Sequence, residues 1–159
     1  MREVLDLQEG RWPVPLLDDA GIADLLRSSR RIAVVGASPD PARPSHDVLV
    51  NLARRGWDVV PISPTAAVVA GLAAYPSLAE AVAATGPFDI VDVFRRPEAA
   101  PVHAREAVAT GARCLWLQLG VISWEAARIA HDGGLAVVMD RCTLIEDGRV
   151  LRSGMRHGA

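Results

Sequence analysis

Short, continuous apolar runs alternate with amphipathic stretches along most of the chain, and this alternation constrains the fold more than any other feature. The strands predicted from these runs cover residues 32–35, 58–62, 90–94, 114–117 and 136–139, which are apolar except for Asp58 and Asp92. Strands that are apolar along their whole length are buried on both faces, as in parallel sheets covered by helices. The pattern therefore predicts an α/β fold: a mostly parallel, doubly wound sheet in a three-layer α/β/α arrangement, forming a single domain.

The stretches between these runs predict helices over 45–55, from about 77, over 98–110 and over 123–131, with a short extended piece near 73–75. Residues 1–30 form a leader that ends in a helix capped by Asp18 or Asp19. The sheet domain is expected over 31–146 and a C-terminal tail over 147–159. After Cys142, the sequence TLIEDGRVLRSG predicts a small hairpin around Asp147-Gly148, and the last residues, GMRHGA, are expected to be loose.

The charge and hydropathy of the chain limit its partners. Half of the 159 residues are hydrophobic and the net charge is −2, which suits a compact core without a basic face. Nucleic acids and anionic membranes are therefore not expected as partners. The N-terminus has acidic residues and no apolar signal segment, and no apolar run is long enough to span a bilayer. We expect a cytoplasmic monomer or small homo-oligomer with two free thiols, Cys114 and Cys142.

All 17 basic residues are arginines, and the chain has no lysine. This excludes a P-loop lysine, a Schiff-base lysine and the lysine of short-chain dehydrogenases. Arginine can still hold a phosphate through two parallel hydrogen bonds.

Ligands of doubly wound sheets bind beyond the carboxyl ends of the strands, where the strand order reverses. The residues that follow the predicted strands are therefore the candidates for a binding site. They are Gly36-Ala37-Ser38, Ser63-Pro64, Arg95-Arg96, Gln118-Leu119-Gly120 and Asp140-Arg141-Cys142.

The first of these segments has features of a phosphate-binding loop. Gly36 allows a tight turn that brings backbone amides close to a diphosphate, and Ser38 adds a hydroxyl. Pro44 or Ser45 begins the next helix, whose positive end favours an anion. An ordinary strand-to-helix turn with a steric glycine remains the alternative.

The second and third segments bear on the choice of ligand. Proteins that bind NAD usually carry an acid at the end of the second strand, whereas this chain has Ser63. Arg95 and Arg96 leave a buried strand on the ligand side, which favours an anionic ligand. A solvated loop is the alternative for these two arginines, and also for Arg43 and Arg141.

Taken in order, the strings VVGAS…RPS, VVPISP, VDVFRRPE, LWLQLG and GLAVVMDRC resemble the small stand-alone CoA-binding proteins. They also resemble the N-terminal CoA-binding domain of the succinyl-CoA synthetase α subunit, and the resemblance covers about residues 31–146. It implies a Rossmann-like domain that holds coenzyme A with the diphosphate at the first loop.

The resemblance also implies roles for residues by position. It places Gly36, Ala37, Ser38, Arg43 and Ser45 around the phosphates, Ser63, Pro64, Phe94 and Arg95 around the nucleotide, and Gln118, Arg141 and Cys142 towards the pantetheine arm. The chain departs from the family where a polar or basic residue often follows the second-strand proline, because it has Thr65-Ala66 there. Arg95 or Arg96 is then expected to hold the 3′-phosphate.

No catalytic set emerges from the sequence. The larger synthetase phosphorylates a histidine in a second domain, which this chain is not expected to contain. His46, His103, His131 and His157 are scattered without metal-ligand spacing. Cys142 could meet the thiol of the ligand, or it could be an inert buried cysteine.

The sequence thus predicts a protein that binds CoA or acyl-CoA, with no evident catalytic machinery. A nicotinamide-dependent oxidoreductase, or an acyl-CoA synthetase component acting with a partner chain, is the alternative.

Overall fold

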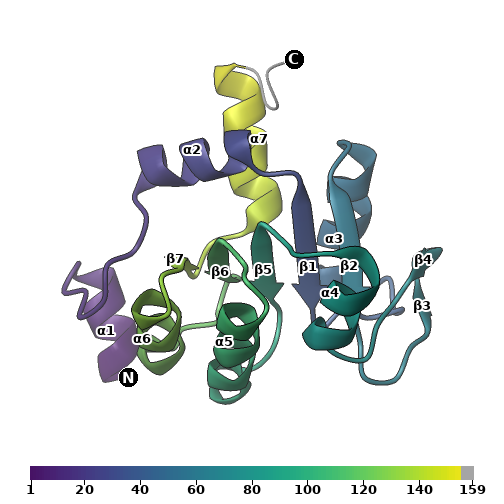
Figure 1. Ribbon diagram of the computed structural model, residues 1–159. Coiled ribbons are helices and arrows are strands. Elements are labelled where there is room, and N and C mark those ends of the chain that lie inside the picture. Colours follow the sequence, from purple (N-terminus) through teal and green to yellow (C-terminus); the bar gives the residue numbers. More distant parts are fainter. Residues whose placement is uncertain (155–159) are drawn as a thin grey trace.

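The computed structural model describes residues 1–154. The C-terminal residues that were predicted to be loose, His157 among them, lie outside the described residues after Gly154. A five-stranded sheet has the order β2-β1-β5-β6-β7, and every pairing in it is parallel (Figure 1). Its strands are β1 (Arg31–Val35), β2 (Asp58–Ile62), β5 (Ile90–Val93), β6 (Cys114–Leu117) and β7 (Ala136–Met139). The predicted parallel sheet is confirmed.

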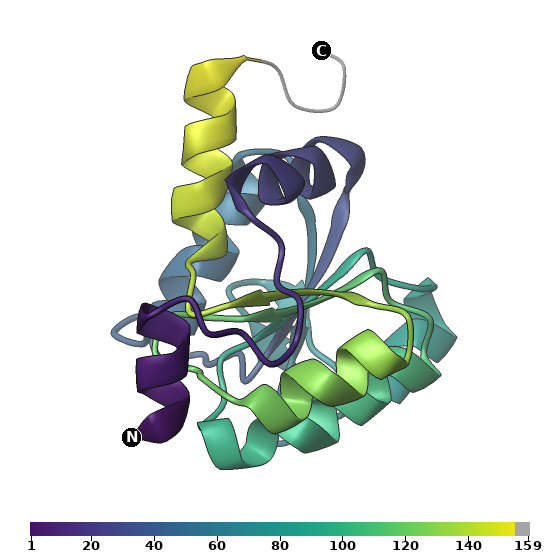
Figure 2. The same ribbon diagram turned by 90° about the vertical axis from the view of Figure 1, so that its left-hand side faces the viewer.

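Helices cover both faces of this sheet, as the edge-on view in Figure 2 shows. One face carries α4 (Leu78–Thr85), α5 (Ala100–Ala109) and α6 (Trp124–Asp132), and the short 3₁₀ helix η1 (Pro97–Ala99) precedes α5. The other face carries α2 (Asp19–Ser28), α3 (Pro44–Arg54) and α7 (Thr143–Ser153). The three-layer α/β/α arrangement is therefore confirmed.

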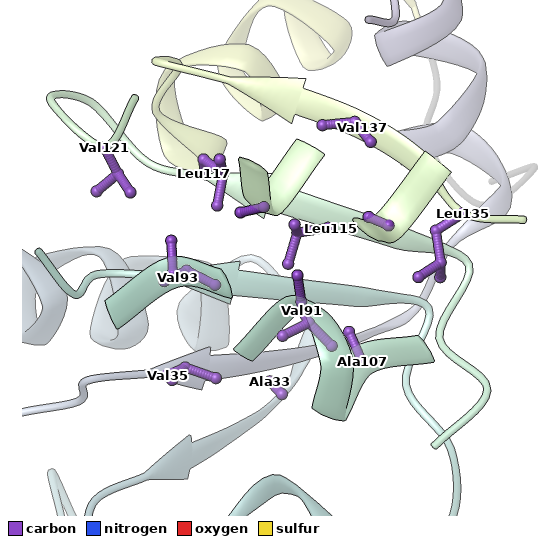
Figure 3. Packing of buried hydrophobic residues seen from close by; sticks show 14 of the residues in the cluster. Ala33, Val35, Val91, Val93, Ala107, Leu115, Leu117, Val121, Leu135 and Val137 are labelled. Carbon is purple, nitrogen blue, oxygen red and sulfur yellow. The ribbon is translucent and has the colours of Figure 1, made fainter. Parts of the chain in front are cut away.

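Alternate residues of each strand pack into two separate cores. Ala33, Val91, Leu115 and Val137 are register partners on neighbouring strands and lie in one row under α5 and α6 (Figure 3). The residues between them face the opposite core, which includes Ile32, Val34, Ile90, Cys114, Trp116 and Val138. Because both faces are buried, nearly all strand positions are apolar, which explains the apolar runs; the buried Asp92 in β5 is an exception.

The strand order reverses between β1 and β5. The chain moves outwards from β1 to β2, and then returns to the other side of β1 as β5. The carboxyl ends of β1 and β5 therefore flank a crevice of the kind in which doubly wound folds bind ligands.

A small antiparallel hairpin follows β2 and accounts for the extended piece predicted near 73–75. It consists of β3 (Val68–Val69) and β4 (Leu72–Ala73). Ala70 and Gly71, between the strands, both have positive φ angles of 50° and 78°. Two such residues in sequence suit a two-residue hairpin turn.

The N-terminal segment lies against the sheet domain and contains a helix that the sequence pattern did not predict, α1 (Arg2–Gln8). The indole nitrogen of Trp124 donates to the carbonyl of Glu3, and the amide of Leu17 donates to the carbonyl of Val137. Asp18 caps α2, because its side chain accepts a hydrogen bond of 2.8 Å from the amide of Gly21. No helix within residues 1–154 is long and apolar enough to cross a membrane.

The hairpin predicted around Asp147-Gly148 is wrong, because α7 continues through both residues. The Asp147 side chain is fully buried and forms an ion pair of 3.1 Å with Arg55. A Cβ on Gly148 would lie 3.8 Å from the guanidinium of Arg55, so the glycine lies close to this ion pair. These tertiary contacts outweigh the turn preference of the Asp-Gly dipeptide. The boundary drawn between residues 146 and 147 falls inside this helix.

Candidate ligand-binding site

A cavity of about 670 Å³ opens at the carboxyl end of the sheet. It is bounded by the loop after β1 and the first turn of α3, by the end of β5, and by the segments after β6 and β7. The predicted site residues that line it are Gly36, Ser38, Arg43, Ser45, Phe94, Arg95, Gln118 and Cys142. The fold thus brings together residues that are more than 100 positions apart in the chain, such as Gly36 and Cys142.

Ala37, Ser63 and Pro64 do not line this cavity. The Ala37 side chain is buried in the core beside α3. The hydroxyl of Ser63 accepts hydrogen bonds from the amides of Thr65 and Ala66, at 3.4 and 3.1 Å, so it stabilises its own loop. Pro64 lines a smaller cavity of about 180 Å³, and Gly36 and Arg95 line both this cavity and the main one.

Arg141 is also separate from the main cavity. Its guanidinium forms ion pairs with Asp19 at 2.6 Å and with Glu146 at 3.5 Å. The hydrogen bond and charge of Arg141 lower the pKa of the Asp19 carboxyl. Arg141 lines a different cavity with Trp12, next to the N-terminal segment. The structure therefore gives this arginine a role in attaching that segment.

Gly36 contributes space to the site rather than a free amide. The amides of Gly36 and Ala37 both donate to the carbonyl of Ile62, at 3.2 and 3.1 Å. Gly36 has a φ of +86°, and a Cβ there would lie 2.9 Å from the carbonyl oxygen of Phe94. Its missing side chain therefore lets the ends of β1 and β5 approach each other.

Polar groups near the end of β1 come from Ser38 and from the start of α3. The hydroxyl of Ser38 accepts a hydrogen bond from the amide of Asp40, and its carbonyl oxygen lies 2.9 Å from Nδ1 of His46. These contacts hold the loop in one conformation. Pro44 is the first residue of α3, and Ser45 after it is buried and lines the cavity. The positive end of the α3 dipole faces the same region and favours an anion there.

Three arginines line this cavity or the one that adjoins it. Arg43 and Arg95 line it, and together with Arg96 they line an adjoining cavity of about 550 Å³. Asp47 and Glu98 are also among the lining residues. No carboxylate within residues 1–154 forms an ion pair with any of these three guanidinium groups. The region is therefore a concentration of positive charge that no ion pair neutralises.

The chain matches the model of a family described as CoA binding domain over residues 30–148. It belongs to this family of CoA-binding domains. A curated relative, the uncharacterized protein YneT of Bacillus subtilis, is 41% identical over 123 residues, which are 77% of this chain and 89% of YneT.

Two solved structures resemble this CoA-binding domain. A hypothetical protein from Pyrococcus horikoshii has a TM-score of 0.80 and 33% identity, over 85% of this chain and 93% of that chain. The dinucleotide-forming acetyl-coenzyme A synthetase 1 of Ca. Korarchaeum cryptofilum has a TM-score of 0.63 and 25% identity. That match covers 75% of this chain and 28% of the synthetase.

This CoA-binding domain also has a buried acid next to the cavity, which the sequence analysis missed. Asp92 lies inside β5 and is fully buried. Its carboxyl accepts a hydrogen bond of 2.8 Å from the hydroxyl of Thr143, and the amide of Gln118 lies 2.9 Å from its other oxygen. Burial raises the pKa of Asp92 well above its ordinary value. These hydrogen bonds fix Gln118 at the cavity wall. In the sequence, the presence of an acid within an otherwise apolar strand was the feature that could have identified Asp92.

Within residues 1–154, no group of three or more histidine, cysteine, aspartate or glutamate side chains is placed to hold a metal ion.

Proposed function

We propose that this protein binds coenzyme A or an acyl-CoA in the cavity at the carboxyl end of the sheet. The observation that carries the proposal is the group formed by Arg43, Arg95 and Arg96, which have no ion-pair partners within residues 1–154. Guanidinium groups of this kind suit a ligand with several phosphates. Coenzyme A carries a diphosphate and a 3′-phosphate.

The residues that line the cavity suit the two parts of coenzyme A. Those that follow β1, namely Ser38, Arg43 and the start of α3, provide hydroxyls and positive charge for the diphosphate. Those that follow β6, namely Gln118, Leu119 and Val121, provide an amide and apolar surface for the pantetheine arm. The volume of about 670 Å³ lies within the usual range of small-molecule sites.

The end of β2 favours coenzyme A over NAD. The residues that follow this strand, Ser63-Pro64-Thr65-Ala66, include no carboxylate that could hold the ribose hydroxyls of NAD. A carboxylate there would also repel the 3′-phosphate of coenzyme A. Because the Ser63 hydroxyl is engaged in its own loop, we assign the 3′-phosphate to Arg95 or Arg96.

The proposed role is binding without a reaction of its own. The second candidate is an acyl-CoA synthetase component that acts with a partner chain, and the likeness to 28% of the Ca. Korarchaeum cryptofilum synthetase favours it. In that case this chain contributes the CoA site and the partner contributes the catalytic groups.

Native mass spectrometry of the freshly purified protein tests the proposal. We expect a complex with one CoA or acyl-CoA per chain, and CoA should rebind after the ligand has been removed by dialysis. A ligand-free protein that does not take up added CoA would contradict the proposal. Co-purification of a second chain would favour the synthetase component.

A further inference from the structure

Asp92 is an acid in the middle of an otherwise apolar strand. Its neighbours Val91 and Val93 face the core under α5 and α6 (Figure 3), so the Asp92 side chain faces the opposite core, where it meets Thr143 of α7. No arginine or histidine within residues 1–154 forms an ion pair with its carboxyl. Burial without a counter-charge favours the neutral, protonated form of an acid.

The carboxyl of Asp92 is linked to the cavity through Gln118. One end of the Gln118 amide group lies 2.9 Å from Oδ1 of Asp92, and the hydroxyl of Thr143 donates to Oδ2 at 2.8 Å. Asp92 and Thr143 are both fully buried, whereas Gln118 is 4% exposed and lines the main cavity. The end of the amide group that points away from Asp92 is therefore the end that a ligand meets.

The proton on Asp92 determines which end of the amide that is. An ionised carboxylate only accepts hydrogen bonds, so it holds the Gln118 nitrogen, at 2.9 and 3.3 Å, and leaves the amide oxygen for the ligand. A protonated Oδ1 donates, so it holds the Gln118 oxygen and leaves the amide nitrogen for the ligand. In that orientation the backbone amide of Thr143 also donates to the Gln118 oxygen, at 3.4 Å. The cavity wall thus offers an acceptor in one protonation state and a donor in the other.

We propose that Asp92 is a positioning residue that orients Gln118 for the pantetheine arm and takes up a proton from solvent when coenzyme A binds. The Gln118 nitrogen then donates to a carbonyl oxygen of the arm. The inference rests on the proposed function, because it needs the ligand beside Gln118. It goes beyond that function, because it makes retention of coenzyme A depend on pH.

Two effects of the ligand favour the protonated state. A ligand that fills the cavity displaces water from beside Gln118, which makes a charge on Asp92 more costly. The phosphates of coenzyme A bring negative charge to the cavity, which also disfavours a carboxylate. Binding therefore raises the pKa of Asp92 further. By linkage, the affinity for coenzyme A falls as the pH rises through the pKa that Asp92 has in the free protein.

Other titratable groups lie around Asp92, and a test must hold them constant. Cys114 on β6 faces it, since burial and then the charge of Asp92 raise the pKa of that thiol. The register partners of Asp92, Val34 on β1 and Trp116 on β6, do not titrate. The charged or titratable groups of the surrounding elements are His46 and Asp47 on α3, Glu146 and Asp147 on α7, and Arg43, Arg95 and Cys142 at the cavity.

Asp92→Asn is the matched variant, because it keeps all of these groups and has the shape of the protonated acid. Its nitrogen can donate to Gln118 while its oxygen accepts from Thr143. Calorimetric titration with coenzyme A between about pH 6 and pH 9 compares the variant with the parent protein. We expect the parent to lose affinity relative to the variant by about threefold or more across this range. Parallel pH profiles would overturn the inference and leave the proposed function in place.

The parent protein alone provides a second measurement. Titrations at about pH 8 in two buffers with different heats of ionisation give the number of protons that are taken up on binding, and phosphates and histidines are largely deprotonated at this pH. Net uptake that is smaller in Asp92→Asn supports the inference, whereas release or no exchange of protons by the parent overturns it. A parent that binds no coenzyme A at any pH overturns the proposed function as well.

Asp92→Ala tests the positioning of Gln118. This variant leaves the inner end of the Gln118 amide without its partner, so it should bind coenzyme A more weakly than Asp92→Asn at every pH, by about threefold or more. Equal affinities of the alanine and asparagine variants would show that Asp92 does not orient Gln118.

Discussion

A Cβ atom on Gly36 would lie 2.9 Å from the Cδ of Arg95. The glycine at the end of β1 therefore makes room for the arginine that leaves β5. Arg95 lines the main cavity, the adjoining cavity with Arg96, and the smaller cavity with His103. The two residues together set the shape of the crevice at the point where the strand order reverses.

Replacement of Gly36 by alanine should destabilise the protein and weaken CoA binding. The φ of +86° already disfavours a side chain, and the added Cβ would displace Arg95 or the Phe94 carbonyl. Gly56→Ala is a matched control, because Gly56 has a φ of +95° with no atom within 4 Å of the added Cβ. We expect a larger loss of unfolding free energy for Gly36→Ala, by about 1 kcal/mol or more. Equal losses and unchanged CoA affinity for both variants would show that Gly36 has no special role.

Removal of either cavity arginine should weaken CoA binding. A hydrogen bond to a charged group contributes about 1.5–3 kcal/mol, so Arg43→Ala and Arg95→Ala should each lower the affinity about tenfold or more. Arg128→Ala on α6 is the control, since this arginine is exposed and outside the cavity. Isothermal titration calorimetry measures all three. If neither cavity variant loses affinity, the phosphates bind elsewhere.

Arg141 should behave differently from these arginines. Since it pairs with Asp19 and Glu146, Arg141→Ala should reduce the attachment of the N-terminal segment and leave CoA affinity close to that of the parent protein. Limited proteolysis should then show faster cleavage before α2. A loss of CoA affinity as large as that of Arg95→Ala would return Arg141 to the binding site.

Asp92 should make stability fall as pH rises. Its pKa in the folded protein is raised above the ordinary 3.8, so the folded state retains a proton that the unfolded state has lost. The contribution is complete below pH 3.8 and is lost as the pH rises through the folded pKa. Asp92→Asn removes this dependence, because its side chain does not titrate. Denaturant unfolding between pH 4 and pH 8 should show the difference between variant and parent shifting in favour of the variant. A difference that stays constant would mean that Asp92 does not titrate in this way.

The sheet and the end of it at which the cavity lies could be predicted from the sequence, because both depend on local patterns. Continuous apolar runs indicated buried strands, and the residues after them include those that line the cavity, such as Gly36, Arg95 and Gln118. Helix α7 could not be predicted, since the burial of Asp147 against Arg55 depends on contacts between distant segments. For the same reason the sequence did not show that Arg141 pairs with Asp19.

The choice among nucleotide ligands tests the central claim most directly. Coenzyme A, dephospho-CoA and NAD share a diphosphate, so discrimination must come from the arginines and from the absence of an acid after β2. Calorimetric titration of one preparation with all three ligands should give the affinity order coenzyme A, then dephospho-CoA, then NAD. The gap between the first two should shrink as salt is added, because salt screens the 3′-phosphate charge. NAD binding as tightly as coenzyme A would contradict the account and favour an oxidoreductase.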